Sequence, residues 1–65
     1  MEKANALIRS RIESAGLRYW QVADVLGMHD SNFSRMLRRE LNPESMQLVL
    51  AAIEKAKERY YNEHS

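Results

Sequence analysis

The side chains best suited to binding chemistry are concentrated between positions 29 and 39. Arg35, Arg38 and Arg39 fall within five positions with no acidic residue between them, and they form the densest basic cluster in the chain. An arginine guanidinium can donate two parallel hydrogen bonds to guanine, and an asparagine amide can pair in the same way with adenine. The polar residues before the arginines are His29, Asp30, Ser31, Asn32 and Ser34. This combination of side chains is typical of a surface that binds nucleic acid.

No group of residues has the spacing that catalysis or metal binding requires. The sequence contains no nucleophile–base pair, no phosphate-binding glycine loop and no metal-ligand motif. His29 and His64 are too isolated to form a metal site, and the chain has no cysteine. A chain of 65 residues also leaves no room for a separate ligand-binding domain. We therefore expect no enzyme activity, no cofactor and no small-molecule ligand.

Length and composition fit one small domain, 1–65. Hydrophobic residues make up 45% and charged residues 29%, which are ordinary values for a globular domain. The net charge of +1 supports nucleic-acid binding only weakly, although residues 1–42 carry seven basic and five acidic residues (+2) and residues 43–65 carry three and four (−1). No apolar run approaches the roughly 20 residues that span a bilayer, and no apolar signal segment opens the chain. We expect a cytoplasmic protein without membrane contact.

Apolar spacing predicts an all-α fold, a compact bundle of four helices. The expected helices cover residues 3–15, 19–26, 30–39 and 43–62. Gly16 and Gly27 should end the first two helices because glycine adopts positive φ at little cost. Either His29 or Asp30 should cap the third helix, and Asn42 should cap the last, which Pro43 begins. At 1.5 Å per residue the last helix would be about 30 Å long, so its final turns are expected to project, fray or contact another chain.

Each helix is expected to bury one apolar stripe. The stripes consist of Ala4, Leu7, Ile8, Ile12 and Ala15 in the first helix, Tyr19, Val22, Ala23 and Leu26 in the second, Phe33, Met36 and Leu37 in the third, and Met46, Val49, Leu50, Ile53, Ala56 and Tyr60 in the last. Arg9, Arg11 and Glu13 lie on other faces of the first helix, where we expect solvated charges. Trp20 has three interpretations, which are packing, a rim facing phosphates or an interface anchor. Packing is favoured.

Residues 19–38 meet the steric requirements of a helix-turn-helix. This motif needs a small residue where its two helices touch, a residue tolerant of positive φ in the turn, and apolar residues beside the turn and on the inner face of the second helix. The residues that supply these features are Ala23, Leu26, Gly27, Met28, Phe33 and Met36. In this geometry the third helix, 30–39, would lie in the major groove of DNA with its first residues at the base edges.

The motif resembles that of the Cro/repressor-like (XRE-type) helix-turn-helix superfamily in the pattern Ala23-x-x-x-Gly27-Met28-x-x-x-x-Phe33-x-x-Met36. The stretch 22–41 is also similar to a group of short proteins from Gram-positive bacteria and their mobile elements, and the likeness covers about residues 4–57. The resemblance implies a bacterial or phage protein that binds double-stranded DNA, as a transcriptional regulator or as an accessory factor of a mobile element.

The expected DNA contacts divide into base edges and phosphates. Base contacts are assigned to His29, Ser31, Asn32, Ser34 and Arg35, with Arg35 as the main base reader. Phosphate contacts are assigned to Arg18, Tyr19, Arg38 and Arg39, although Arg39 could equally be a solvated charge. The chain departs from the superfamily at two of these positions. Tyr19 stands where the superfamily often has a phosphate-binding glutamine, and His29 stands where serine or threonine is common.

Two functions of different kinds are open at this stage. The first is a sequence-specific DNA-binding protein, with a homodimer through the last helix because a single domain contacts few base pairs. The second is a protein-interaction module on the same scaffold. The small net charge favours the second function, as do Trp20 and the two tyrosines of the last helix, Tyr60 and Tyr61. Either function would use side chains that the helix-turn-helix leaves exposed.

Overall fold

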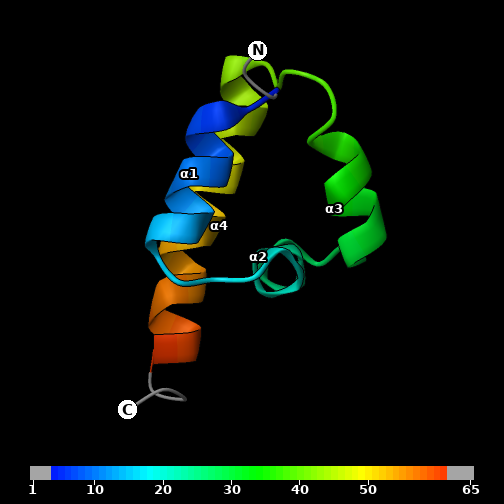
Figure 1. The fold of residues 1–65 in the computed structure, drawn as a ribbon. Coiled ribbons are helices and arrows are strands. Elements are labelled where there is room, and N and C mark those ends of the chain that lie inside the picture. Colours follow the sequence, from blue (N-terminus) through cyan, green and yellow to red (C-terminus); the bar gives the residue numbers. More distant parts are fainter. Residues whose placement is uncertain (1–3, 62–65) are drawn as a thin grey trace.

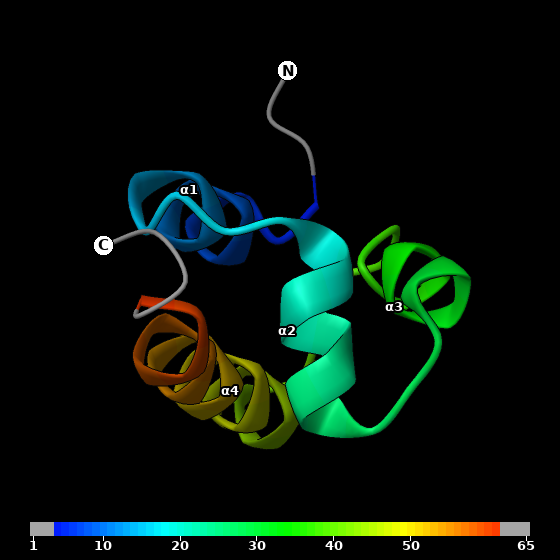
Figure 2. The same cartoon turned by 90° about the horizontal axis from the view of Figure 1, so that it is seen from below.

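The computed structural model of the chain describes residues 4–61, and within this range every regular element is a helix. The elements are α1 (Ala6–Ser14), α2 (Tyr19–Leu26), α3 (Asp30–Met36) and α4 (Pro43–Tyr61). Helices α1 and α4 lie side by side (Figure 1). Helix α2 crosses between this pair and α3, which lies on the far side of α2 (Figure 2). The predicted all-α bundle of four helices with a long last helix is confirmed.

One core is shared by all four helices. Its buried apolar residues are Ile8, Ile12, Val22, Ala23, Phe33, Leu37, Val49, Ala52, Ile53, Ala56 and Tyr60. These residues confirm most of the predicted stripes. Leu7 is the exception, because its side chain is 48% exposed. At 3.6 residues per turn Leu7 lies about 100° around α1 from Ile8, so it falls outside the narrow stripe that Ile8 and Ile12 form.

The turns after α1 and α2 are built in the same way. Gly16 and Gly27 adopt φ values of 70° and 74°, in the left-handed region. After α2, the N–H of Met28 donates to the carbonyl of Ala23 at 3.0 Å, which closes the helix and directs the chain toward α3. The prediction that these two glycines end their helices is confirmed.

Side chains satisfy the free N–H groups at the starts of α3 and α4. Of the two candidates for the N-cap of α3, His29 takes this position, and its Nδ1 accepts from the N–H of Ser31 at 3.3 Å. Asp30 is the first helical residue, where its charge faces the positive end of the helix dipole. Asn42 caps α4 as predicted, because its Oδ1 accepts from the N–H of Ser45 at 2.7 Å.

Two helices are shorter than predicted. Helix α1 begins at Ala6 because Asn5 has φ 59° and therefore breaks the helical backbone. Helix α3 ends at Met36 and not at residue 39, because the N–H of Arg38 donates to the carbonyl of Arg35 at 3.2 Å in a tightened last turn. The side chain of Asn5 binds the Leu37 and Arg39 carbonyls that follow. The predicted bounds at residues 3 and 62 lie outside the described residues, as does the side chain of Tyr61.

The last described turn of α4 packs on α2. Tyr60 is buried, and its hydroxyl donates to Oδ2 of Asp24 at 2.9 Å. Arg59 lies 3.1 Å from the same oxygen. Trp20 meets the ring of Tyr60 on α4 edge to face, with centroids 5.7 Å apart, and keeps 50% of its surface exposed, so Trp20 is packed on one side only. The expectation that the final turns project, fray or meet another chain is wrong as far as Tyr60, because α2 supplies these partners.

The turn at Gly27 gives a first test of this architecture. We expect Gly27→Ala to lower the free energy of unfolding by about 1–2 kcal/mol, because a Cβ is strained at this φ. No atom lies within 4 Å of the position that the Cβ would occupy, so the cost is conformational and not steric. Gly27→Asn should cost less, since asparagine tolerates left-handed backbone. Urea unfolding followed by circular dichroism measures both values, and a Gly27→Ala protein as stable as the parent would contradict the turn geometry.

Candidate nucleic-acid interface

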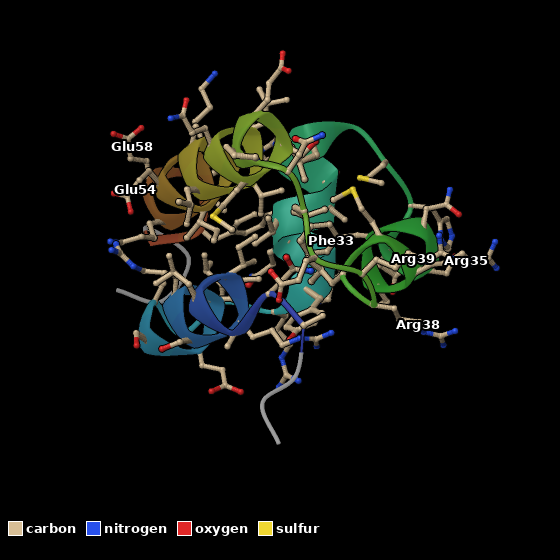
Figure 3. The ribbon with its side chains drawn as sticks, turned by 90° about the horizontal axis from the view of Figure 1, so that it is seen from above. Phe33, Arg35, Arg38, Arg39, Glu54 and Glu58 are labelled. Atoms are coloured by element: carbon tan, nitrogen blue, oxygen red, sulfur yellow. The ribbon has the colours of Figure 1, made fainter. Side chains whose placement is uncertain are left out.

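The inner face of α3 packs on α2. Phe33 is fully buried, and its ring lies against Tyr19 with centroids 6.0 Å apart and an interplanar angle of 74°. Leu37, the C-cap residue, is also fully buried, and Met36 is half-buried. These contacts fix the rotation of α3 about its own axis. The residues on the opposite side of α3 therefore face away from the bundle (Figure 3).

The outer face of α3 carries the residues that the sequence assigned to base contacts. All five are exposed, namely His29, Ser31, Asn32, Ser34 and Arg35. Arg35 follows Ser31 by four positions, so these two residues lie in one row along the middle of the outer face, and Arg38 follows in the turn after α3. Asn32 and Ser34 lie on either side of this row. An α-helix with its side chains is about 10–12 Å across, which fits a major groove about 12 Å wide.

The side chains of Arg35, Arg38 and Arg39 are exposed and have no protein partner among residues 4–61. No hydrogen bond or ion pair joins any of the three guanidinium groups to another residue of that range. Figure 3 shows the three arginines together on the α3 side of the molecule, with Arg35 and Arg38 pointing away from the bundle. Their guanidinium donors are therefore available to a ligand. We refer to the three residues as the arginine cluster.

Few acidic side chains lie near the arginine cluster. Glu54 and Glu58 lie on α4, on the opposite side of the molecule (Figure 3). Glu40 follows the cluster directly, but its carboxylate accepts from the backbone N–H of Asn5 at 2.7 Å. Between positions 29 and 39 the three arginines accompany a single acidic residue, Asp30, so this stretch carries +2 while the whole chain carries +1. The net charge thus understates the positive charge at α3.

Asn5 fixes the chain that follows α3. Its side chain is buried, and Nδ2 donates to the carbonyls of Leu37 at 2.9 Å and Arg39 at 2.7 Å, while Oδ1 accepts from the N–H of Leu41 at 2.9 Å. In a continuing helix the Leu41 N–H would donate to the Leu37 carbonyl. The α-helical bonding has already ended at Arg38, whose N–H donates to the carbonyl of Arg35 at 3.2 Å, and the Asn5 amide then bonds to both Leu37 and Leu41 and holds the turn. Arg38 and Arg39 consequently belong to the turn after α3 and not to the helix.

Arg9 supports the same turn from the next part of α1. Its Nη2 donates to the Leu37 carbonyl at 3.1 Å, Nε to the Ala4 carbonyl at 2.9 Å, and Nη1 to the Tyr19 hydroxyl at 3.1 Å. A positive charge near the C-terminus of α3 is also favoured by the helix dipole. The expectation that Arg9 is a solvated charge is wrong, because α3 and α2 supply these partners. We call Asn5 and Arg9 the α1 clamp.

The two phosphate candidates at the start of α2 have different surroundings. Arg18 is the exposed N-cap residue. Tyr19 is half-buried, with its ring against Phe33 and its hydroxyl accepting from Arg9. Tyr19 therefore has a structural role in the packing of α3, and its hydroxyl hydrogen is the group left for a phosphate. Arg18 is exposed and has no such role in packing.

The described residues provide little for other kinds of site. Across residues 4–61, no three histidine, aspartate or glutamate side chains gather closely enough to hold a metal ion. No helix in that range has the length and apolar character needed to cross a membrane. A hollow between α2 and α4 is open to solvent, and its lining of Val25, Lys55, Glu58 and Arg59 mixes both charges with one apolar residue. None of these features competes with the outer face of α3 as a binding surface.

Substitutions at two arginines of α1 should distinguish a side chain with a structural role from one that is only exposed on the surface. Arg9→Met keeps most of the aliphatic stem but removes three hydrogen bonds, and we expect it to lower the free energy of unfolding by about 1–3 kcal/mol. Arg11→Met is the matched control, because Arg11 lies on the same helix and is exposed. Its effect should stay within about 0.5 kcal/mol. Equal stability losses in urea unfolding would show that the Arg9 contacts add nothing.

Comparison of the chain with protein-family models, with curated proteins and with solved structures yields no match in any of the three. The exposed side chains of α3, and the contacts that hold α3 in place, are therefore the basis for a functional proposal.

Proposed function

We propose that the chain is a sequence-specific DNA-binding protein that places α3 in the major groove. The observation that carries this proposal is the exposure of Arg35 on the outer face of α3 and of Arg38 in the turn that follows, whose side chains lack protein partners among residues 4–61. Guanidinium groups on such a face match guanine edges and phosphate oxygens. Because Phe33 and the α1 clamp hold the helix from its other side, the outer face is free to contact DNA.

The side chains divide between base reading and phosphate contact according to their place on the helix. Arg35 lies on the helix itself and is the proposed base reader, with His29, Ser31, Asn32 and Ser34 as further base contacts. Arg38 and Arg39 follow in the turn and are proposed to contact phosphates. Arg18 and Tyr19 at the start of α2 complete the phosphate contacts.

The resemblance to Cro/repressor-like proteins supports a cytoplasmic regulator of transcription or an accessory factor of a mobile element. Half-sites on DNA lie one helical turn apart, about 34 Å, so two copies of the chain would read one operator. A homodimer through α4 is part of the proposal. Tyr60 is buried and does not serve this contact, whereas Leu48 on α4 is 63% exposed. Sedimentation at several concentrations tests the homodimer.

One observation favours a second candidate, a protein-interaction module. Trp20 leaves 50% of its surface exposed beside Tyr60, and tryptophan is enriched at the centres of protein interfaces. The exposed part of Trp20 belongs to α2, so this surface differs from the arginine cluster. The two candidates therefore depend on different side chains, and substitutions can separate them.

The DNA proposal is tested by removing charge from one face at a time. We expect the double substitution Arg35→Ala, Arg38→Ala to weaken binding to a fluorescent random duplex at least tenfold at low salt, since each contact contributes about 1–3 kcal/mol. The control Lys55→Ala, Lys57→Ala removes the same charge from exposed residues of α4 and should change the affinity by less than about threefold. Fluorescence anisotropy measures both. Equal losses would indicate only a general effect of charge, and no binding by the parent protein would refute the proposal.

Single substitutions should distinguish the two kinds of contact. We expect Arg35→Ala to relax the preference at one or two base positions, because a base reader is lost. Arg38→Ala should weaken binding to all sequences alike and reduce the salt slope by about one. Selection of bound sequences from a random DNA pool, followed by salt titration on the selected duplex, measures both effects. Identical preferences for the parent and the Arg35→Ala protein would contradict the assignment of Arg35.

A further inference from the structure

We infer that Asn5 is a positioning residue for DNA binding: by binding the backbone on both sides of Arg38 it sets where Arg38 and Arg39 meet the phosphates. This inference rests on the proposed function. It assigns to the buried residue that precedes α1, far from the outer face of α3, control over two of the three arginines in the cluster. Asn5 itself touches no DNA.

The side chain of Asn5 makes hydrogen bonds to backbone groups on both sides of Arg38 and Arg39 in the sequence. Nδ2 binds the carbonyl of Leu37, which directly precedes Arg38, and the carbonyl of Arg39 itself, at 2.9 and 2.7 Å. Oδ1 binds the N–H of Leu41 at 2.9 Å. The backbone on both sides of Arg38 is therefore tied to α1. Arg9 shares the Leu37 carbonyl, but no other described side chain binds the Arg39 carbonyl or the Leu41 N–H.

The burial of Asn5 makes this arrangement specific. The residue is 1% exposed, so each of its polar atoms must find a partner within the protein or cost about 1–3 kcal/mol. All of them do, and no buried side-chain nitrogen or oxygen among the described residues lacks a partner. An alternative path for residues 37–41 would leave the Asn5 amide unpaired. The turn that presents Arg38 and Arg39 is thus held before any ligand arrives.

A fixed turn lowers the cost of binding. Ordering a long side chain on binding costs roughly 0.5–1.5 kcal/mol, and a mobile backbone adds to that cost. The clamp removes the backbone part for Arg38 and Arg39. The same residue also restrains Glu40, whose carboxylate accepts from the Asn5 N–H at 2.7 Å. Asn5 therefore positions the two arginines and holds the adjacent negative charge at the start of α1.

The test uses Asn5→Gly, because glycine keeps the positive φ and the backbone N–H while removing only the side-chain amide. We expect the ¹³C backbone shifts of residues 37–39 in the free protein to move toward random-coil values, since the Asn5 amide no longer holds the Leu37 and Arg39 carbonyls or the Leu41 N–H. On DNA, the salt slope should fall by about one to two as the phosphate contacts of Arg38 and Arg39 are lost. The further substitutions Arg38→Ala and Arg39→Ala should lower the affinity for DNA at least tenfold in the parent protein and less than threefold in the Asn5→Gly protein.

Tyr60→Phe is the control for destabilisation alone. It removes the hydroxyl that bonds to Asp24 at the other end of the molecule and leaves Asn5 untouched, so its salt slope should equal that of the parent. Unchanged shifts at residues 37–39 in Asn5→Gly, or an unchanged salt slope, would overturn the inference. If the parent binds no DNA, the proposed function fails, whereas the shifts still decide whether Asn5 holds the turn after α3. If Asn5→Gly does not fold, the ¹³C backbone shifts of the parent protein provide the test, because helical shifts that continue through Arg39 would overturn the inference.

Discussion

A single buried amide connects the start of α1 to the end of α3. The Asn5 side chain bonds to the Leu37 carbonyl and to the Leu41 N–H, two groups that would bond to each other if α3 continued. A buried amide that lost these partners would cost about 1–3 kcal/mol for each, so the chain is held to one path here. The turn that follows α3 and the direction in which α4 begins both depend on this path. Arg9 strengthens the arrangement at the same carbonyl.

Structural support from one side leaves the other side of α3 free for function. Phe33 fixes the inner face, His29 caps the first turn, and the α1 clamp holds the end. The outward arginines make no contact on which the fold depends among the described residues. This separation favours a DNA-binding surface over an accidental group of solvated charges. The case for a protein partner rests on Trp20, because Tyr60, its neighbour on α4, is part of the core.

Local signals in the sequence predicted much of this fold. The bounds of α2, the glycine turns and the Asn42 cap each depend on residues within one turn of the feature, and they agree with the structure. The predicted third helix runs past the end of α3 into a turn that is held by Asn5, more than 30 positions away, so no local signal marks this turn. Nothing in the spacing around Arg9 distinguishes it from Arg11, although one is bonded to α3 and the other is exposed. The sequence identified the exposed candidates on α3, whereas the residues that hold them needed the structure.

Chemical-shift mapping of the ¹⁵N-labelled protein during titration with a short random duplex at low salt is the decisive test of whether α3 binds DNA. We expect the amide signals of residues 29–39, with those of Arg18 and Tyr19, to shift in proportion to bound DNA. Signals of residues 54–58 on the opposite side of the molecule should stay in place. Unshifted signals in α3 at low salt, or shifts centred on Trp20 and the outer surface of α4, would contradict the claim that α3 is the DNA-binding surface.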